Sequence, residues 1–555
     1  MLINRGLTDP REARTFLEPS LHELSDPTEH DSLGEAAEFL KQKIADGRKI
    51  AIYGDYDADG ICATALLVRA LRKVEADVSY YIPRRFDEGY GLNCEALSTL
   101  KDEGTEVVVT VDCGVSATTE AIHANEIGLD ILVTDHHRPR DVRPDCPFVL
   151  NPHLPECNFG YEKLAGVGVA FKLAWALGQK MGGGGEVPES YRELLMELLA
   201  LTAIGTIADM VPLTDENRVL AHYGLQVLPH TSNPGLRALL EAVGAGDEKR
   251  LGTFHVGYQI APRLNAVGRM ADARAAVEML TTDDPDRAAE LASQLDKHNR
   301  ERRDIQHQGT DEARDHIERS PELSQAPCIV VSHPDWHPGV VGLIANRIAE
   351  EYWRPAFVFS EKDGTARGSA RSIPGFHLFD AVSECEDLLD RFGGHEGAAG
   401  LSLPLNKLKD FRERICRIAD RELSPEKAVP HLELEGEVEL SSLSLSVIKE
   451  MRRLAPFGEW NPSPLFCARD LELVGNPQIV GSRRNHLSFL VRQNDTTLKV
   501  IAFRKADWLK EMREHEEEPL HLAFEPRINN YRGRNSVELR AEDLQWAGEE
   551  DIEKL

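Results

Sequence analysis

Short apolar runs alternate with amphipathic stretches over roughly the first quarter of the chain. Four runs rich in β-branched residues are expected to be strands, and they lie at 49–53, 78–82, 107–111 and 131–134. Helical patterns lie before and between them, at 33–45, 63–74, 95–100 and 117–127. Because the runs are apolar nearly throughout, both faces of each strand should be covered, as in a parallel α/β sheet.

A long polar segment divides the rest of the chain. Residues 286–317 are mostly charged and carry apolar or small residues at Ala288, Leu291, Leu295 and Ile305, which predicts a long, solvated connecting helix. A second β-rich region opens at Cys328, and short β-like runs after His431 predict a small barrel. We therefore expect a helical segment at 1–48, an α/β domain at 49–285, a connecting helix at 286–320, a second α/β domain at 321–425, a barrel at 430–546 and an acidic tail at 547–555.

Composition narrows the class of protein. With 41% hydrophobic and 28% charged residues, the 555-residue chain should be globular and have several domains. It shows no apolar run that could span a bilayer and no secretory signal at its start, so we expect a cytoplasmic protein. The nine cysteines form no C-x-x-C pair, which argues against a disulfide framework or a zinc site.

The net charge of −29 argues, by itself, against a nucleic-acid partner, because phosphate contacts need Lys and Arg. Net charge does not decide local charge, however, and an acidic protein can bind DNA in a basic groove. High-salt adaptation would also produce an acidic surface, and the sequence leaves that question open.

Carboxylates gather directly after three of the four predicted strands. Asp55, Asp57 and Asp59 alternate in the turn after the first strand, and Asp112 follows the third. The run Asp135-His136-His137 follows the fourth strand, and Asp209 lies in a fourth motif, Ala-Asp-Met-Val-Pro, at 208–212. Open parallel sheets place ligands at the carboxyl ends of their strands, so these side chains should meet at one edge.

Crowded carboxylates predict bound cations, since their mutual repulsion is otherwise costly. Oxygen and nitrogen ligands of this kind suit Mg²⁺ or Mn²⁺, and two such ions can hold the attacking and leaving oxygens of a phosphoryl displacement. A calcium loop of the EF-hand type is disfavoured because Leu66 stands where its bidentate Glu is required. The pattern predicts a two-metal phosphoesterase.

The four motifs resemble motifs I to IV of the DHH phosphoesterase superfamily. Segment 261–270 and positions Leu295, Asp296, Asn299, Arg302, Arg303 and Gln306 are similar to those of the RecJ single-strand-specific DNA exonucleases. Segments 336–342, 368–372 and 392–400 resemble the DHH-associated domain, and 456–462 resembles the lead-in to an OB-fold. The resemblance extends from the N-terminus to about Trp546.

The resemblance implies an α/β fold in which a parallel-sheet DHH domain is joined by a long helix to a DHH-associated α/β domain, with a C-terminal OB-fold β-barrel. It implies a 5′→3′ exonuclease that degrades single-stranded DNA to 5′-mononucleotides with Mn²⁺ or Mg²⁺, in DNA repair and recombination. A single-strand-binding protein and a RecQ-type helicase are expected partners, and metal preference, DNA-versus-RNA stringency, processivity and oligomeric state are left open.

Site residues are carried over motif by motif. The implied metal ligands are Asp55, Asp57, Asp59, Asp112, His136 and Asp209. His137 joins them as a catalytic residue that orients His136 or meets the phosphate. Many superfamily members have a His ligand where Tyr53 stands, so we expect Asp55 to take its place.

Strand binding is predicted at two places. Near the metal ions the expected contacts are Arg263, Asn265, Arg269, Ser369, Arg371, Ser372, Gly394 and His395. Ser369, Arg371, Gly394 and His395 are expected to form a pocket for a 5′-phosphate, because the planar fork of Arg matches phosphate. On the barrel the expected contacts are Arg483, Arg484, Tyr531 and Arg532, as basic and aromatic residues suit a single-strand platform. Pairing with the many acidic residues is the alternative for each cation.

Two other functions remain open at this stage. A DHH-type hydrolase of short oligonucleotides or cyclic dinucleotides would use the same metal site but has no evident need for the long connector and the barrel. A non-catalytic DNA-binding scaffold would keep the fold, but such proteins usually lose the carboxylates, and all of them are present here.

Overall fold

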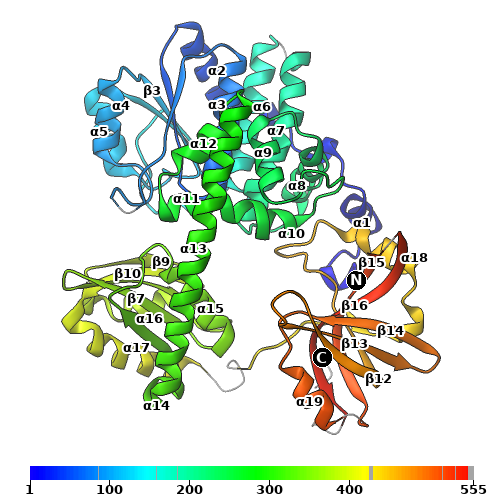
Figure 1. Ribbon diagram of the computed structural model, residues 1–555. Helices are drawn as coiled ribbons and strands as arrows, with labels where there is room; N and C mark the ends of the chain where they lie inside the picture. The colour runs from blue at the N-terminus through cyan, green and yellow to red at the C-terminus, as the bar shows by residue number, and fades with distance from the viewer. Residues whose placement is uncertain are drawn as a thin grey trace.

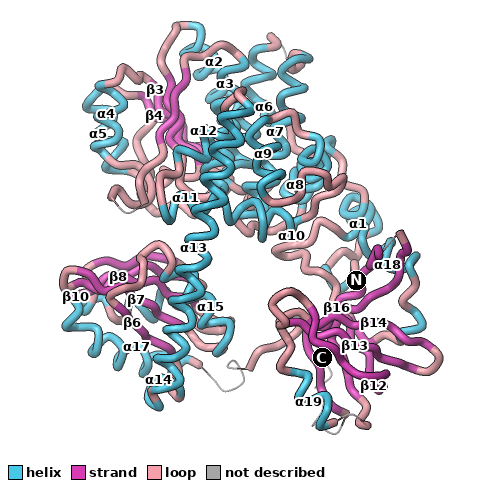
Figure 2. Tube along the Cα trace, viewed as in Figure 1, coloured by secondary structure: helices cyan, strands magenta, loops and turns pink. Residues whose placement is uncertain are grey.

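A computed structural model describes residues 1–29, 31–85, 87–157, 159–183, 185–423, 429–515, 517–531 and 533–547. Figure 1 shows two α/β domains joined by one long helix, with a β-barrel beside them. The same view coloured by secondary structure shows strands gathered into three separate sheets (Figure 2). Within the described residues, no helix is both long and apolar enough to cross a bilayer.

The first sheet is entirely parallel and has the order β2-β1-β3-β4-β5. Its strands are β1 (Ile50–Tyr53), β2 (Val78–Tyr81), β3 (Val107–Val111), β4 (Asp130–Thr134) and β5 (Phe148–Leu150). Because β1 lies between β2 and β3, the strand order reverses there, and a crevice opens at the carboxyl ends of β1 and β3. Asp55 to Asp59 and Asp112 follow these two strands.

Helices cover both faces of this sheet, which explains its apolar strands. One face packs against α4 (Cys94–Asp102) and α5 (Thr118–Ile127), and the other against α2 (Asp31–Ala45), α3 (Ala58–Lys73) and α6 (Gly166–Met181). Further helices extend the second layer (Figure 1): α7 (Glu189–Ala208), α8 (Asp215–Val227), α9 (Pro234–Ala242), α10 (Thr253–His255), α11 (Ala261–Met270) and α12 (Arg274–Thr281). A π-helical turn, Val256–Ile260, lies between α10 and α11.

The connecting helix α13 (Pro285–Arg319) is capped by Asp284, whose carboxylate accepts backbone N–H bonds from Asp286 and Arg287. Its first half packs on α9, α11 and α12, and its second half on α15 of the next domain. The short helix α14 (Pro321–Ser324) follows it. One helix therefore belongs to the cores of both α/β domains.

The second sheet has the order β6-β7-β8-β10-β9, from β6 (Ile329–His333), β7 (Ala356–Lys362), β8 (Thr365–Arg371), β9 (Arg391–Gly394) and β10 (Ala398–Pro404). Its apolar face packs on α16 (Leu378–Ser383) and α17 (Leu408–Glu422). On the other face α15 (Val341–Tyr352) and α13 cover β6 and β7. Helix α15 also packs against β8, whereas none of these helices covers β10 and β9 on that face in the described residues.

The C-terminal domain is a barrel of five strands that closes where β12 pairs with β15. Its strands are β12 (Phe466–Val480), β13 (His486–Gln493), β14 (Thr496–Ala502), β15 (Leu520–Tyr531) and β16 (Arg534–Trp546), with β11 (Gly436–Glu437) at the edge of β12. Helices α18 (Leu445–Met451) and α19 (Trp508–Glu514) complete its core. The predicted combination of α/β domains and barrel is confirmed.

A buried arginine ties the barrel to the first domain. Arg218 on α8 is 2% exposed and donates to the carbonyls of Phe16, at the end of α1 (Pro10–Leu17), and of Ala455 and Pro456 before the barrel. The Leu213 amide donates to the Glu459 carbonyl 2.9 Å away. The segment that leads into the barrel is therefore hydrogen-bonded to Leu213, four residues after Asp209.

Candidate metal centre

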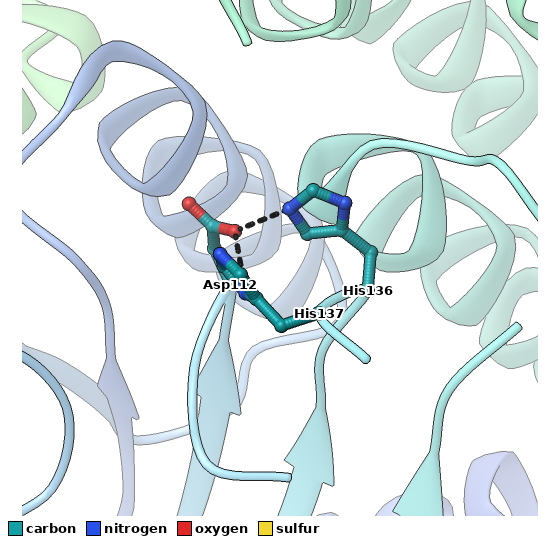
Figure 3. A group of neighbouring side chains, drawn as sticks. All are labelled: Asp112, His136 and His137. Carbon is teal, nitrogen blue, oxygen red and sulfur yellow. Dashed lines mark ion pairs between the residues drawn. The ribbon is translucent and has the colours of Figure 1, made fainter. Parts of the chain in front are cut away.

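The predicted ligands converge where β1, β3 and β4 end. His136 Nε2 lies 3.0 Å from Asp112 Oδ1, 3.6 Å from Asp209 Oδ2 and 4.0 Å from Asp59 Oδ2. Figure 3 shows both His136 and His137 directed at the carboxylate of Asp112. Ligand atoms of three groups come within 4.8 Å of one another: Asp55, Asp57 and Asp112; Asp59, His136 and Asp209; and Asp112, His136 and His137.

Local backbone structure holds the first three carboxylates. Asp57 caps α3, accepting the N–H groups of Asp59 and Gly60. Asp59 lies in the first turn of α3, where its two oxygens accept the N–H groups of Gly166 and Val167 at 2.7 and 3.0 Å. These donors form the first turn of α6, so its positive dipole end also favours a carboxylate there. Asp59 is fixed by two helix N-termini.

Three glycines allow the segments to approach this closely. A Cβ on Gly60 would lie 2.7 Å from the Asp55 Cβ, and one on Gly166 would lie 2.8 Å from Asp112 Oδ1. A Cβ on Gly205 would lie 2.5 Å from Asp59 Oδ1. Larger residues at these positions would push the carboxylates apart, so the cluster depends on the missing side chains.

The charges of the cluster are not balanced by the protein. Burial, followed by the charge of Asp209, raises the pKa of Asp59 to about 7, and burial, followed by Asp57, raises that of Asp209 to about 7. Burial together with neighbouring carboxylates also raises the pKa values of Asp55 and Asp112 well above their usual range. A divalent cation would stabilise the ionised forms.

The donor set fits divalent cations. Asp55 Oδ1, Asp112 Oδ1 and His136 Nε2 are buried and make no hydrogen bond, although the last two lie 3.0 Å apart. Buried polar atoms in proteins are almost always paired, and a group of unpaired ones indicates a ligand-binding site. Carboxylate oxygens and an imidazole nitrogen are suitable ligands for Mn²⁺ and Mg²⁺.

Asp135 and Tyr90 support the centre, and the sequence motifs alone did not assign them a role. Asp135 is 1% exposed and accepts the Nδ1–H of His137 at 2.7 Å and the backbone N–H groups of His136 and Val115. Although burial opposes it, the hydrogen bond to Asp135 raises the pKa of His137 to about 9. The Tyr90 hydroxyl lies 3.1 Å from the Asp112 carbonyl and 3.2 Å from His137 Nδ1.

Tyr53 lies away from the cluster. It is fully buried, donates its hydroxyl to the Gly91 carbonyl at 3.0 Å and stacks on Tyr81. It therefore offers no ligand atom, consistent with the expectation that Asp55 serves in its place.

A second cluster consists of arginines without carboxylate partners. Arg85, Arg269, Arg302 and Arg371 form no ion pair within the described residues. Burial, followed by the cations of Arg85, Arg302 and Arg371, lowers the pKa of Arg269 to about 9. Burial and Arg85 lower that of Arg371. Arg85 and Arg302 were not among the predicted contacts, since only the fold brings segments so distant in sequence together. Partly buried, mutually repelling guanidinium groups indicate an anion site.

Other predicted strand contacts have partners inside the protein. Arg263 pairs with Asp296 at 2.8 Å, and Asn265 accepts the Ala58 N–H at 2.7 Å. Ser372 donates to the Phe376 carbonyl, and His395 Nδ1 accepts the Gly397 N–H. Ser369 Oγ accepts from Arg371 at 3.3 Å. Their role as strand contacts stays a prediction.

On the barrel, Arg483 and Arg484 are exposed and have no ion pair in the described part of the chain. Burial, then Arg303 and Arg483, lowers the pKa of His307 on α13, so this barrel loop faces the connecting helix. The side chain of Tyr531 and all of Arg532 lie outside the described residues, as does most of the acidic tail.

The fold and the centre together define a DHH-type phosphoesterase with a second α/β domain. Residues 49–206 match the DHH family N-terminal domain, residues 325–420 the DHHA1 domain and residues 434–543 the RecJ OB domain. These matches cover all three globular parts of the chain.

Comparison with individual proteins narrows the class. The single-stranded-DNA-specific exonuclease RecJ of Salmonella typhimurium is 36% identical over 98% of this chain and 94% of its own length. RecJ of Bacillus subtilis is 42% identical over 91% of this chain, which spans 63% of that longer protein. The crystal structure of RecJ from Thermus thermophilus in complex with Mn²⁺ superimposes with a TM-score of 0.80 and 32% identity, covering 98% of this chain and 75% of that one. This chain belongs to the RecJ family.

Proposed function

We propose that this protein is a metal-dependent exonuclease that degrades single-stranded DNA from the 5′ end to 5′-mononucleotides, in DNA repair and recombination. The observation that carries the proposal is the pairing of two clusters, one of mostly buried carboxylates and one of partly buried arginines, across the two α/β domains. The first suits divalent cations and the second suits a phosphate.

Mn²⁺ or Mg²⁺, when bound, would supply charge stabilisation to the attacking and leaving oxygens of the scissile phosphodiester. Asp55, Asp57, Asp59, Asp112, His136 and Asp209 would hold the ions. Solved RecJ structures contain Mn²⁺ or Mg²⁺, which supports this cofactor choice.

The chain's own residues position the strand. Asp135 holds His137 in one orientation and favours its protonated form, so its exposed edge can donate to a phosphate oxygen. Arg269 and Arg371 supply fixed donors for phosphate oxygens, and their arrangement before substrate arrives avoids the cost of ordering them later. Because Arg371 lies in the second domain, a phosphate on it would be held across the gap from the ions.

The 5′→3′ direction of degradation would follow from binding of the terminal 5′-phosphate. If Ser369, Arg371, Gly394 and His395 bind a 5′-phosphate, only a strand end can reach the carboxylates in register. The barrel, matching the RecJ OB domain, would hold the strand farther along. A single-strand-binding protein and a RecQ-type helicase are proposed partners, and the cytoplasm is the proposed location.

The decisive experiment is a time course on end-labelled single strands with Mn²⁺, using wild type and Asp112→Ala in parallel. Release of mononucleotides from the 5′ end by wild type alone is the expected result. Cleavage restricted to very short oligomers would identify a small-substrate hydrolase instead. Strand binding without cleavage by either protein would identify a scaffold.

A further inference from the structure

A cavity of about 400 Å³ lies between the two α/β domains, beside the arginine cluster. The loop after β2 contributes Arg85 and residues 87–89 to one wall. Arg367, Arg391 and Ser402 line the opposite wall, on the β8-β10-β9 side of the second sheet. The predicted strand contacts did not include these three residues.

The strand register places the three side chains in one row. Ser402 on β10 pairs with Arg367 on β8 and with Arg391 on β9. The next row on the same face consists of Ser369, Gly400 and Gly393, because side chains two residues apart point the same way. Ala366 and Ala370 point to the apolar side. A Cβ on either glycine would meet open space, so no side chain stands above the sheet at these two positions of the second row.

The row lies beyond the predicted 5′-phosphate pocket as seen from the metal centre. Arg371 is close enough to Arg85 and Arg269 to affect pKa values, whereas Arg367 is four residues back along β8, about 13 Å in an extended strand. In Figure 1 the barrel lies to the right of α13, and β9 and β10 lie to its left. A strand held by the barrel and cut at the metal centre would therefore release its terminal nucleotide toward this side.

The charges in the cavity favour an anion. Arg367 and Arg391 make no ion pair or side-chain hydrogen bond within the described residues. Two carboxylates also line the cavity, but both have other partners. Glu88 accepts from Tyr81, Asn93 and the Arg84 amide, and Asp87 lies 3.9 Å from Arg84. In a chain with 93 acidic residues and 64 basic ones, two unpaired arginines in one row of a sheet indicate a binding role.

We propose that Arg367, Ser402 and Arg391 form an exit site that binds the phosphate of a nucleoside 5′-monophosphate after cleavage. The inference rests on the proposed function, and it adds a product site one row beyond the pocket that holds the 5′ end. Guanidinium groups on both sides of a hydroxyl match the three oxygens of a phosphate monoester.

Binding of thymidine 5′-monophosphate to the Mn²⁺-loaded 555-residue chain without DNA tests the site. We compare wild type with Arg367→Gln/Arg391→Gln by calorimetry and use Arg417→Gln, an exposed arginine on α17 behind the sheet, as the matched control. The double variant should lose one equivalent of bound nucleotide or bind about tenfold more weakly, because two charge-assisted contacts are removed. Thymidine, which lacks the phosphate, should not compete.

Degradation assays give the second measurement. The inhibition constant of thymidine 5′-monophosphate should rise in the double variant while the KM for the strand stays that of wild type. Unchanged nucleotide binding in the double variant would overturn the exit site. A rise in the KM for the strand as large as the rise in the inhibition constant would also overturn it, because the row would then hold the incoming strand. The calorimetric comparison needs no cleavage. Failure of wild type to release mononucleotides would therefore count against the proposed function and not against nucleotide binding at the exit site.

Discussion

Asp112 combines burial, backbone strain and charge in one residue. It is 3% exposed, and its φ of 61° lies in the left-handed region that non-glycine residues rarely adopt. Strain of this kind persists where the surroundings enforce it, often at functional sites. The backbone turn after β3 directs the carboxylate toward both Asp55 and His136, so the strained conformation brings these predicted ligands together.

We expect Asp112→Asn to abolish activity yet stabilise the metal-free protein at pH 8. Activity should fall by about 100-fold or more, the scale of losing a group that organises transition-state charge. The pKa values of Asp59, Asp112 and Asp209 are raised in the folded protein, to about 7 for Asp59 and Asp209. The stability that these groups contribute is therefore fully present below their unfolded pKa of about 4. It is lost as the pH rises through the folded pKa values. Removing one charge should therefore raise the Tm in EDTA at pH 8. The decrease in Tm between pH 5 and pH 8 should also be smaller in the variant than in wild type.

Asp135→Asn is the matched control for that prediction. Although burial opposes it, hydrogen bonding with His137 lowers the pKa of Asp135, so its charge stabilises the fold above the unfolded pKa and that contribution is lost at acid pH. Its replacement should lower the Tm at pH 8. If both variants shifted the Tm in the same direction, the electrostatic account of the cluster would be wrong.

Arg371→Ala should reduce the preference for 5′-phosphorylated over 5′-hydroxyl strands by about tenfold, as expected for loss of one charge-assisted contact. Arg371→Lys should keep part of the preference, since it restores charge without the planar fork. The ratio of kcat/KM on the two substrates measures this. An unchanged ratio in Arg371→Ala would remove Arg371 from the 5′-phosphate pocket.

At the scale of elements, helix α7 approaches the centre through a glycine. Gly205 faces Asp59 with room for no Cβ, and Val167 of α6 lies 2.8 Å from the position that a Cβ would occupy. Ala normally stabilises a helix interior over Gly by up to about 1 kcal/mol. At Gly205 this gain is opposed by the clash of the added Cβ with Asp59, a predicted metal ligand.

Gly205→Ala should therefore weaken Mn²⁺ affinity by about tenfold, in the range seen when groups that orient ligands are changed. Gly257→Ala is the control, because a Cβ at this helical glycine meets open space. Metal titration of the two variants provides the comparison. Equal metal affinity in both would show that α7 can shift without disturbing Asp59.

At the scale of the whole molecule, we propose that the three domains act on one substrate path. Helix α13 connects the two α/β cores, and Arg218 fixes the lead-in of the barrel to α8. The barrel loop with Arg483 and Arg484 faces α13 near His307. The strand would thus pass from the barrel along the connecting helix toward the arginine cluster.

Arg483→Gln/Arg484→Gln should weaken strand binding and make it less sensitive to salt. Each phosphate contact contributes about 0.7 to the slope of log K against log salt for single strands, so the slope should fall by about 1.4. Arg527→Gln, an arginine already paired with Glu525 at 2.7 Å, should leave the slope nearly unchanged. Equal slopes in wild type and the double variant would place the strand elsewhere on the barrel.

The sequence by itself determined the elements and the metal chemistry. Apolar runs of β-branched residues, helical periodicity and the Asp284 cap are local features, so strands β1 to β4 and helix α13 follow from neighbouring residues alone. The carboxylate motifs could be placed together because parallel strands bring their carboxyl ends to one edge, whatever the rest of the fold does.

Only the tertiary structure decided which side chains surround those motifs. Arg85 and Arg371 meet because two domains face each other, and Asn265 reaches the Ala58 amide from a helix far along the chain. The row of Arg367, Ser402 and Arg391 exists through the register of three strands. Register and domain packing depend on contacts distant in sequence, which no local pattern encodes. The motifs and the family resemblance therefore predicted the ligands and a 5′-phosphate pocket, whereas the places of Arg85, Arg302, Arg367, Arg391 and Ser402 beside them follow only from the fold.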